Sequence, residues 1–243
     1  MCHLTATKQK KVIDNTETSL LMQAQAVLNH YLSLVASGQE KPAKYMHFNF
    51  MARGEVLNSP IFKDAEATYS LLSKLRGLSE KIGLNARFLL STIMPTAYEK
   101  YDMNDVFSVI QPYFYYSLYS TKEAFRKQWL PMAMKPELAL DKLARWNNFS
   151  EHKFKVHYAF IEYENDGKNQ INDICDLLLS RGLTPDINIV RYNPYSEKHG
   201  QESKIEIIER NADIFRERLG SHVKVIQRVG KDVKASCGMF IEK

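Results

Sequence analysis

The chain has 243 residues, of which 44% are hydrophobic, so it can bury the core of one domain of barrel size. Lys and Arg number 33 against 28 Asp and Glu, and the net charge of +5 is compatible with a polyanionic partner without requiring one. No apolar run approaches the roughly 18–20 residues that cross a bilayer, and the N-terminus lacks the hydrophobic core of a signal peptide, so we expect a soluble, cytoplasmic protein.

The first part of the chain predicts a loop, a long helix and a strand. Residues 1–9 show neither a helical nor a strand period and are predicted to form a loop. A capping pattern at Asp14 or Asn15 begins an apolar stripe at helical spacing, which predicts a helix up to residue 37. An apolar and aromatic run then predicts a strand over residues 44–52.

The rest of the chain alternates strands with helices. Further strands are predicted over residues 87–93, 113–120, 154–162, 186–192 and 223–229. Further helices are predicted over residues 66–82, 136–147, 171–180 and 205–219. This alternation favours a parallel sheet with crossover helices. We therefore expect an α/β fold, a partial or distorted (β/α) barrel, in a single domain over residues 1–243.

The strand at residues 44–52 ends in Gly54 and Glu55, which would lie at the carboxyl edge of the sheet. Ligands of parallel α/β proteins bind at that edge. A glycine there lets the backbone approach a ligand, and a glutamate can hold a cationic group such as an ammonium. The alternative is an ordinary strand-to-helix turn with a solvated glutamate, and taken alone the stretch favours this plainer interpretation.

Three more strand ends carry polar residues, at Ser91, Ser117 to Tyr119, and Asn193. Together with the Cys-His-Leu-Thr opening and a Ala-Ser-Cys-Gly segment near the C-terminus, they resemble the radical S-adenosylmethionine (SAM) enzymes of the RlmN/Cfr family, which methylate adenine C2 in ribosomal and transfer RNA. The matching segments also include residues 126–131, 166–169, 192–195 and 228–232. Their shared order and spacing carry the resemblance, which runs across essentially the whole chain.

The resemblance implies a partial barrel of the radical SAM type whose first strand is missing. In that family a Cys-x-x-x-Cys-x-x-Cys loop after the first strand gives three thiolates to a 4Fe-4S cluster, and SAM occupies the fourth iron. Cys2 resembles the last of these three ligands. The other two would have to come from an upstream sequence or from a partner polypeptide.

The resemblance also implies which residues bind SAM: Gly54, Glu55, Ser91, Ser117, Leu118, Tyr119 and Asn193. In this assignment the glycine and glutamate contact the ammonium group, the ends of the two serine-bearing strands line the sugar and carboxylate, and the asparagine meets the adenosine. Hydroxyls and amides supply neutral donors and acceptors beside a charged sulfonium. Two positions depart from the family, because Val56 replaces its usual proline and Tyr119 its usual histidine.

The three cysteines are too few and too scattered for a disulfide framework. Cys237 resembles the cysteine that family members methylate and then use to carry the carbon to RNA; the alternative is a small buried residue near a terminus. Cys175 lies in an apolar helical stripe and is predicted to be a core residue. His47 and His157 lack the spacing of a metal site and are predicted to be structural.

Two functions follow as hypotheses. The first is the SAM-binding barrel of an adenine-C2 RNA methyltransferase, active only when the missing cluster ligands are supplied. The rival is a truncated, non-catalytic barrel that binds RNA or a protein. In either case the strand at residues 44–52 would keep an unpaired edge, which predicts self-association.

Overall fold

The computed structural model describes residues 13–51, 54–194 and 199–227. Its helices are α2 (Glu17–Ala36), α3 (Ala65–Glu80), α4 (Met103–Val106), α5 (Glu123–Trp129), α6 (Pro136–Phe149), α7 (Lys168–Leu179) and α8 (Ile205–Leu219). Single 3-10 turns are η1 (Val56–Asn58), η2 (Ile61–Lys63) and η3 (Thr96–Tyr98). The strands are β1 (Tyr45–Phe50), β2 (Asn85–Thr92), β3 (Tyr113–Ser117), β4 (Lys155–Tyr158), β5 (Ile187–Ile189) and β6 (Val223–Val225).

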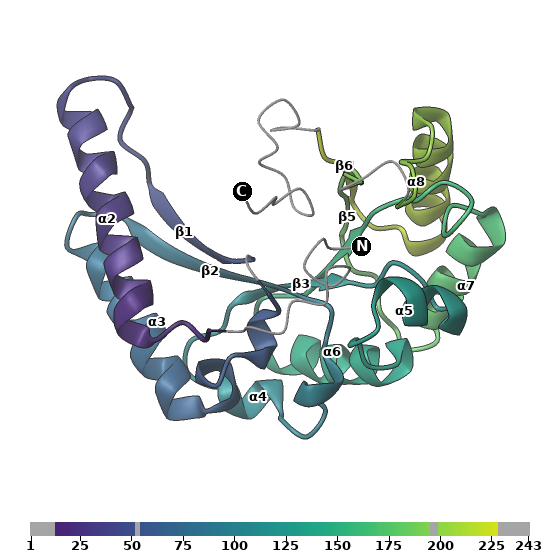
Figure 1. The fold of residues 1–243 in the computed structure, drawn as a ribbon, viewed down its shortest axis with the longest axis horizontal. Coiled ribbons are helices and arrows are strands. Elements are labelled where there is room, and N and C mark those ends of the chain that lie inside the picture. The colour runs from purple at the N-terminus through teal and green to yellow at the C-terminus, as the bar shows by residue number, and fades with distance from the viewer. Residues whose placement is uncertain (1–12, 52–53, 195–198, 228–243) are drawn as a thin grey trace.

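The six strands form one sheet in the order β1-β2-β3-β4-β5-β6, and every neighbouring pair is parallel. The helices lie along the outer, convex side of this curved sheet, and the described chain places no helix on the opposite, concave side (Figure 1). Within the described ranges β1 pairs only with β2 and β6 only with β5, so the barrel is open. This confirms the predicted α/β partial barrel.

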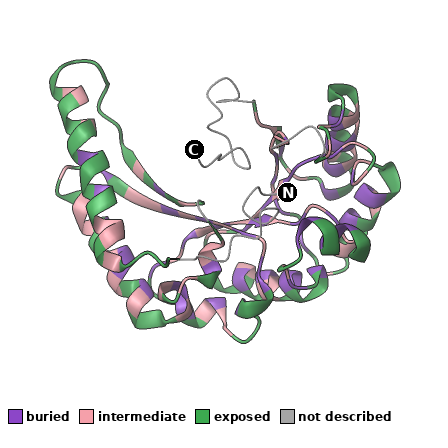
Figure 2. Cartoon of the chain, viewed as in Figure 1, coloured by how far each residue is buried: buried purple, intermediate pink, exposed green. Residues whose placement is uncertain are grey.

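Strand residues alternate between the two faces of the sheet, as a pleated strand requires. Phe88 and Leu90 of β2 are buried against the helices at 3% and 0% exposure. Their neighbours Arg87 and Ser91 fall on the concave face by this alternation and are half-buried. The buried residues of the helices lie toward the sheet (Figure 2), so the core occupies the layer between sheet and helices.

Aromatic contacts dominate this core. Phe114 of β3 meets Trp146 of α6 edge-to-face with ring centroids 5.0 Å apart, and the indole N–H donates to the carbonyl of His152 at 3.0 Å. Cys175 of α7 is fully buried in the same core, which confirms its predicted role. Burial raises the pKa of its thiol to about 11, so it is not a reactive thiolate.

Several element ends differ from the predicted ones. The first helix is capped by Thr16, whose hydroxyl accepts from the amide of Ser19 at 3.1 Å, rather than by Asp14 or Asn15. Strand β4 ends at Tyr158, four residues before the predicted end. The strand stops early because the chain turns there and a buried side chain, Asn165, replaces a neighbouring strand as partner of the backbone.

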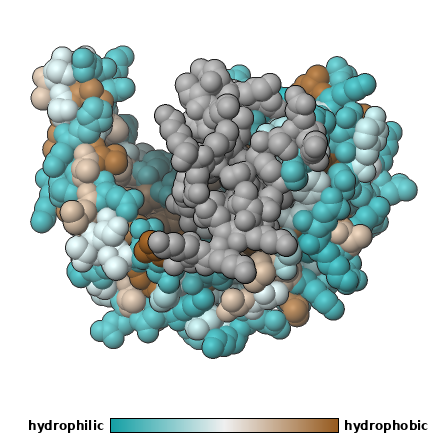
Figure 3. Space-filling model, in the orientation of Figure 1, coloured by the Kyte–Doolittle hydropathy of each residue, from teal (hydrophilic) through white to brown (hydrophobic). Residues whose placement is uncertain are grey.

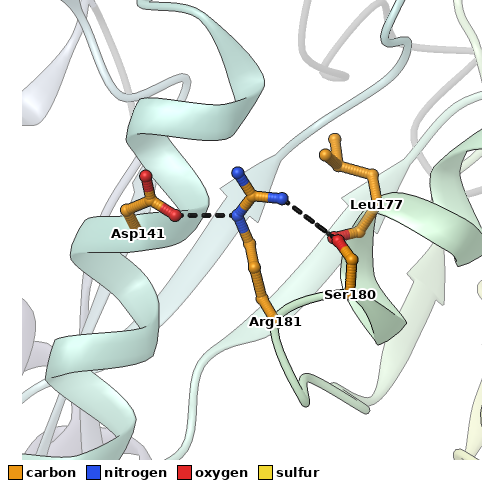
Figure 4. Close-up of polar contacts among 4 residues, drawn as sticks. All are labelled: Asp141, Leu177, Ser180 and Arg181. Carbon is orange, nitrogen blue, oxygen red and sulfur yellow. Dashed lines mark hydrogen bonds and ion pairs between the residues drawn. The ribbon is translucent and has the colours of Figure 1, made fainter.

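Helices α6 and α7 are tied together at the amino side of the sheet. The guanidinium of Arg181, just after α7, donates from Nε to Asp141 of α6 at 2.8 Å (Figure 4). The same guanidinium donates at 3.3 Å to the carbonyl of Leu177 and to the hydroxyl of Ser180. Because this pair is partly exposed, it contributes at most about 1 kcal/mol and serves mainly to orient the two helices.

The edge formed by β1 and α2 is only partly covered. Hydrophobic residues show among hydrophilic ones on the arm that contains α2 in Figure 3, and Met22 and Val27 of this helix are 68% and 55% exposed. Only Ala24 and Leu28 of α2 are fully buried. No helix in the described ranges is long and apolar enough to span a membrane.

Candidate functional site

The carboxyl ends of the parallel strands bring most of the predicted site residues to one edge of the sheet. Gly54 and Glu55 follow β1, Ser91 lies near the end of β2, and Ser117 is the last residue of β3. Asn193 follows β5 at the same edge, after a further stretch of extended chain. The arrangement is the one expected of a ligand site in a parallel α/β protein.

Glu55 is the centre of a hydrogen-bond network that joins the ends of β1 and β2. Its Oε1 accepts from the amide of Leu57 at 3.2 Å and from the hydroxyl of Thr92 at 2.6 Å, while Oε2 accepts from the amide of Ile93 at 3.0 Å. The carboxylate therefore caps η1 and is not the solvated glutamate of the plainer interpretation. Since two carboxylate oxygens offer about four lone pairs, one acceptor position on Oε2 is left for a ligand.

Burial raises the pKa of Glu55, and the hydrogen bonds from Thr92, Ile93 and Leu57 oppose that rise. A cation placed against the remaining lone pair would stabilise the charged carboxylate and lower this pKa. Electrostatically, the site is thus suited to receiving positive charge.

Gly54 has a φ of +99°, a backbone conformation that side chains other than glycine rarely adopt. A Cβ at this position would meet no described heavy atom within 4 Å. The glycine is therefore required by the turn itself, and not by close packing against the described part of the chain.

Ser91 has a buried hydroxyl with no hydrogen-bond partner among the described residues. It pairs in register with Tyr115 of β3 on the concave face. A buried hydroxyl without a partner costs roughly 1–3 kcal/mol, and four other buried side-chain atoms in the described ranges share this property. Among the predicted SAM-binding residues, the structure thus leaves the Ser91 hydroxyl without a described protein partner.

The segment after β3 is more constrained than predicted. Ser117 lies on the concave face and pairs in register with His157 of β4. Leu118 is fully buried in the core, so it can offer a ligand only its backbone. Tyr119 has a φ of +52° and packs its ring 6.1 Å from that of Tyr158.

The strand register also places His157, which the sequence predicted to be structural, on the concave face beside the predicted site. His157 stands between Ser117 of β3 and Asn188 of β5, and its ring lies 4.6 Å from that of Tyr115. Burial lowers its pKa to about 4, so the imidazole is neutral at physiological pH. The alternation of strand residues predicts which face of the sheet His157 takes. Its position beside Ser117 is known only from the pairing of β3 with β4.

Thr92 is a second residue whose part sequence reasoning missed. Its hydroxyl donates to Glu55 and accepts from the amide of Met94 at 2.8 Å, and its side chain is buried. The sequence shows that the strand ends in a hydroxyl residue. It does not show the partner of that hydroxyl, Glu55, which lies 37 residues away. The side-chain amide of Asn193, by contrast, makes a long 3.5 Å contact to the carbonyl of Arg191 in the described part of the chain.

The cysteines of the predicted cluster and methyl-transfer sites, Cys2 and Cys237, lie outside the described residues. So does Arg53 beside Gly54. In residues 13–51, 54–194 and 199–227 no group of three or more His, Cys, Asp or Glu side chains could hold a metal ion. The cysteine in these ranges is Cys175, which is buried in the core, so the described residues do not supply an iron–sulfur ligand set.

No protein-family model matches the chain. It is 27% identical over 131 residues to the probable dual-specificity RNA methyltransferase RlmN of Alkaliphilus metalliredigens, covering 52% of this chain and 36% of the relative. It is 26% identical over 178 residues to the probable RlmN of Clostridium botulinum strain Alaska E43, covering 70% and 49%. The chain thus spans half or less of the length of the curated relatives it matches.

Solved structures agree on the fold. A crystal structure of a radical SAM methyltransferase from Sphaerobacter thermophilus superposes with a TM-score of 0.71 at 20% identity, covering 93% of this chain and 61% of that one. A domain of a pyruvate-formate lyase-activating enzyme from Bacteroides vulgatus gives a TM-score of 0.54 at 16% identity, covering 74% and 98%. The partial barrel therefore has the same fold as the barrel of that methyltransferase.

Proposed function

Because this chain is RlmN/Cfr-like in sequence and has the fold of a radical SAM methyltransferase, we propose that it is the SAM-binding barrel of a radical SAM RNA methyltransferase. One observation carries the proposal. The buried hydroxyl of Ser91 has no partner among the described residues, and it lies next to the strand end where Glu55 accepts three hydrogen bonds from described residues and so keeps a fourth acceptor position. A hydroxyl and a carboxylate at one carboxyl edge suit the polar amino acid end of SAM.

The chain's own residues bind and orient the cofactor in this proposal. Glu55 holds the ammonium through its remaining Oε2 lone pair, since Leu57, Thr92 and Ile93 fix the carboxylate in place. Gly54 leaves room beside the ammonium. The remaining predicted SAM-binding positions, Ser91, Ser117, Leu118, Tyr119 and Asn193, line the rest of the molecule, with Leu118 acting through its backbone.

Catalysis would need ligands that the described residues do not contain. Three thiolates hold a 4Fe-4S cluster in enzymes of this type, which supplies the electron that cleaves SAM. Cys2 is proposed as one of them, and the other two are not assigned to residues of this chain. Cys237 is proposed as the methyl-carrying cysteine.

RNA is the proposed substrate, in the cytoplasm. The relatives are named as RNA methyltransferases, and the net charge of +5 is compatible with a polyanion. The substrate adenine and the choice between ribosomal and transfer RNA are left to experiment.

Titration calorimetry with SAM and with S-adenosylhomocysteine tests the cofactor proposal. We expect binding by the wild-type chain, and a loss of roughly tenfold or more in the Glu55→Gln and Ser91→Ala variants, because each removes one direct polar contact. Glu66→Gln, an exposed glutamate in the first turn of α3, is the matched control and should bind normally. Absence of binding by the wild-type chain would end the cofactor proposal.

The rival function is a non-catalytic barrel that binds RNA or a protein. Anaerobic reconstitution with iron and sulfide, carried out on a version extended upstream, separates the two. A cluster signal and cleavage of SAM support the enzyme. A folded, extended protein that forms no cluster but still binds RNA supports the rival.

A further inference from the structure

A strained turn follows β3 where the predicted site begins. The amide of Ser120 donates to the carbonyl of Leu118 at 2.7 Å, and the residue between them, Tyr119, has a φ of +52°. This is a γ-turn of the rare kind with a positive φ at its central residue. Such a conformation is strained and persists only where the surroundings enforce it.

Arg126 of α5 enforces one side of this turn from the interior. Its guanidinium donates from one nitrogen to the carbonyls of Leu118 and Ser120, both at 3.1 Å, and from the other to the carbonyl of Met134 at 2.6 Å. The residue is only 7% exposed, and no ion pair of Arg126 is found in the described ranges. A buried cation that donates to three carbonyl oxygens is costly unless they are correctly placed, so it strongly favours this one backbone geometry.

Asn165 enforces the other side. Its side-chain amide donates to the carbonyl of Tyr119 and to the carbonyl of Ala159, each at 2.9 Å, while its oxygen accepts from the amide of Ile161 at 2.7 Å. Asn165 is fully buried. All three carbonyls of the turn are thereby bonded to buried side chains from two different elements.

We propose that Arg126 and Asn165 are positioning residues, which hold the Leu118–Ser120 γ-turn so that Ser117 and Tyr119 are preorganised to bind SAM. This inference rests on the proposed function. Preorganisation matters because a segment that is already ordered does not lose conformational freedom when the ligand binds. The two residues act through the turn and need not touch the cofactor.

The chain offers a matched control for the turn. Tyr163 also has a positive φ, of +62°, but it is 90% exposed and lies in the loop after β4. Relief of backbone strain at Tyr163 by substitution with glycine should leave the β3 turn unchanged. Because Tyr163 and Asn165 lie in the same loop, Tyr163→Gly shows how far a change in that loop alters binding when Arg126 and Asn165 are both kept.

The test uses Arg126→Lys and Asn165→Ser in the full chain, with Tyr163→Gly as control. Lysine keeps the charge but cannot donate to three carbonyls in the same fork, and serine keeps polarity but cannot span both carbonyls. Two quantities are measured well below each unfolding temperature: exchange of the Ser120 amide by NMR, and affinity for S-adenosylhomocysteine by calorimetry. Both positioning variants should exchange faster and bind roughly tenfold more weakly, with the control unchanged.

The outcomes are distinguishable. The positioning role is overturned if Arg126→Lys or Asn165→Ser folds and binds S-adenosylhomocysteine within twofold of wild type. A residue with a purely structural role would lower only the unfolding temperature. Wild-type protein that does not bind the analogue overturns the proposed function and the positioning role with it. If Arg126→Lys does not fold, Asn165→Ser decides, because its substitution removes the turn contact from the opposite side.

Discussion

The hydroxyl of Thr92, at the end of β2, donates to the carboxylate of Glu55, which follows β1, at 2.6 Å. This single bond joins two strand ends that are neighbours in the sheet but far apart in the sequence, and it fixes the side chain proposed to hold the SAM ammonium. The geometry of the proposed site thus depends on a hydrogen bond between two side chains of the protein. Five predictions test this and related features.

Replacement of Thr92 by valine should destabilise the protein by about 1–3 kcal/mol, because it leaves Glu55 Oε1 and the amide of Met94 each short of a partner. Denaturation by urea measures the loss. Thr96→Val is the control: its hydroxyl makes an exposed 3.3 Å contact, so the change should be small. Equal stability of the two variants would contradict the network.

Affinity for SAM should fall as the pH drops through the raised pKa of Glu55. Only the ionised carboxylate holds an ammonium, so protonation of Glu55 opposes binding, and bound SAM in turn lowers this pKa. Calorimetry across the acidic range measures the effect. The Glu55→Gln variant should show a flatter profile; an identical slope in both proteins would show that another group is responsible.

His157 should make the fold less stable in acid. Its pKa is lowered to about 4 in the folded protein from 6.5, so the folded state binds the proton more weakly than the unfolded state. The stability that depends on neutral His157 is complete above about pH 6.5 and is lost as the pH falls toward 4. The loss amounts to at most roughly 3 kcal/mol.

Chemical denaturation at a series of pH values checks this, with His157→Gln as the comparison. The variant should lose less stability than wild type between pH 6.5 and 4. NMR titration of the His157 ring gives an independent reading of its pKa. A normal pKa for this ring would refute the prediction.

Two glycine substitutions should shift stability in opposite directions. Gly54→Ala should destabilise the protein by about 1–3 kcal/mol, because its φ of +99° strains any side chain although space is free. Gly77→Ala, in the interior of α3 with nothing within 4 Å of the new Cβ, should stabilise it by about 0.5–1 kcal/mol. Denaturation curves of both variants measure the difference, and a neutral Gly54→Ala would contradict the turn geometry.

Self-association through β1 is the last prediction. Within the described ranges this strand pairs only with β2, and it carries no charged residue to protect its open edge. Light scattering should detect oligomers that weaken in Asn49→Lys, which adds a charge to an exposed edge position. A monodisperse wild-type monomer would mean that another segment covers the edge.

Sequence periodicity by itself determined the fold class. Apolar spacing located six strands and the helices between them, because alternate strand residues and every third or fourth helical residue must face one core. The sequence also predicted that Gly54, Glu55, Ser91 and Ser117 lie at one edge of the sheet, because the carboxyl ends of parallel strands lie at the same edge. The order of the motifs along the sequence also resembles that of the radical SAM methyltransferases.

Only the tertiary structure decided how those residues are used. Glu55 proved to be bonded to Thr92, Leu118 proved to be buried, and Tyr119 proved to occupy a turn held by Arg126 and Asn165. Each of these facts depends on groups brought together from distant parts of the chain. Local sequence sets which face a side chain takes, but the partner that satisfies its hydrogen bonds is chosen when the elements pack.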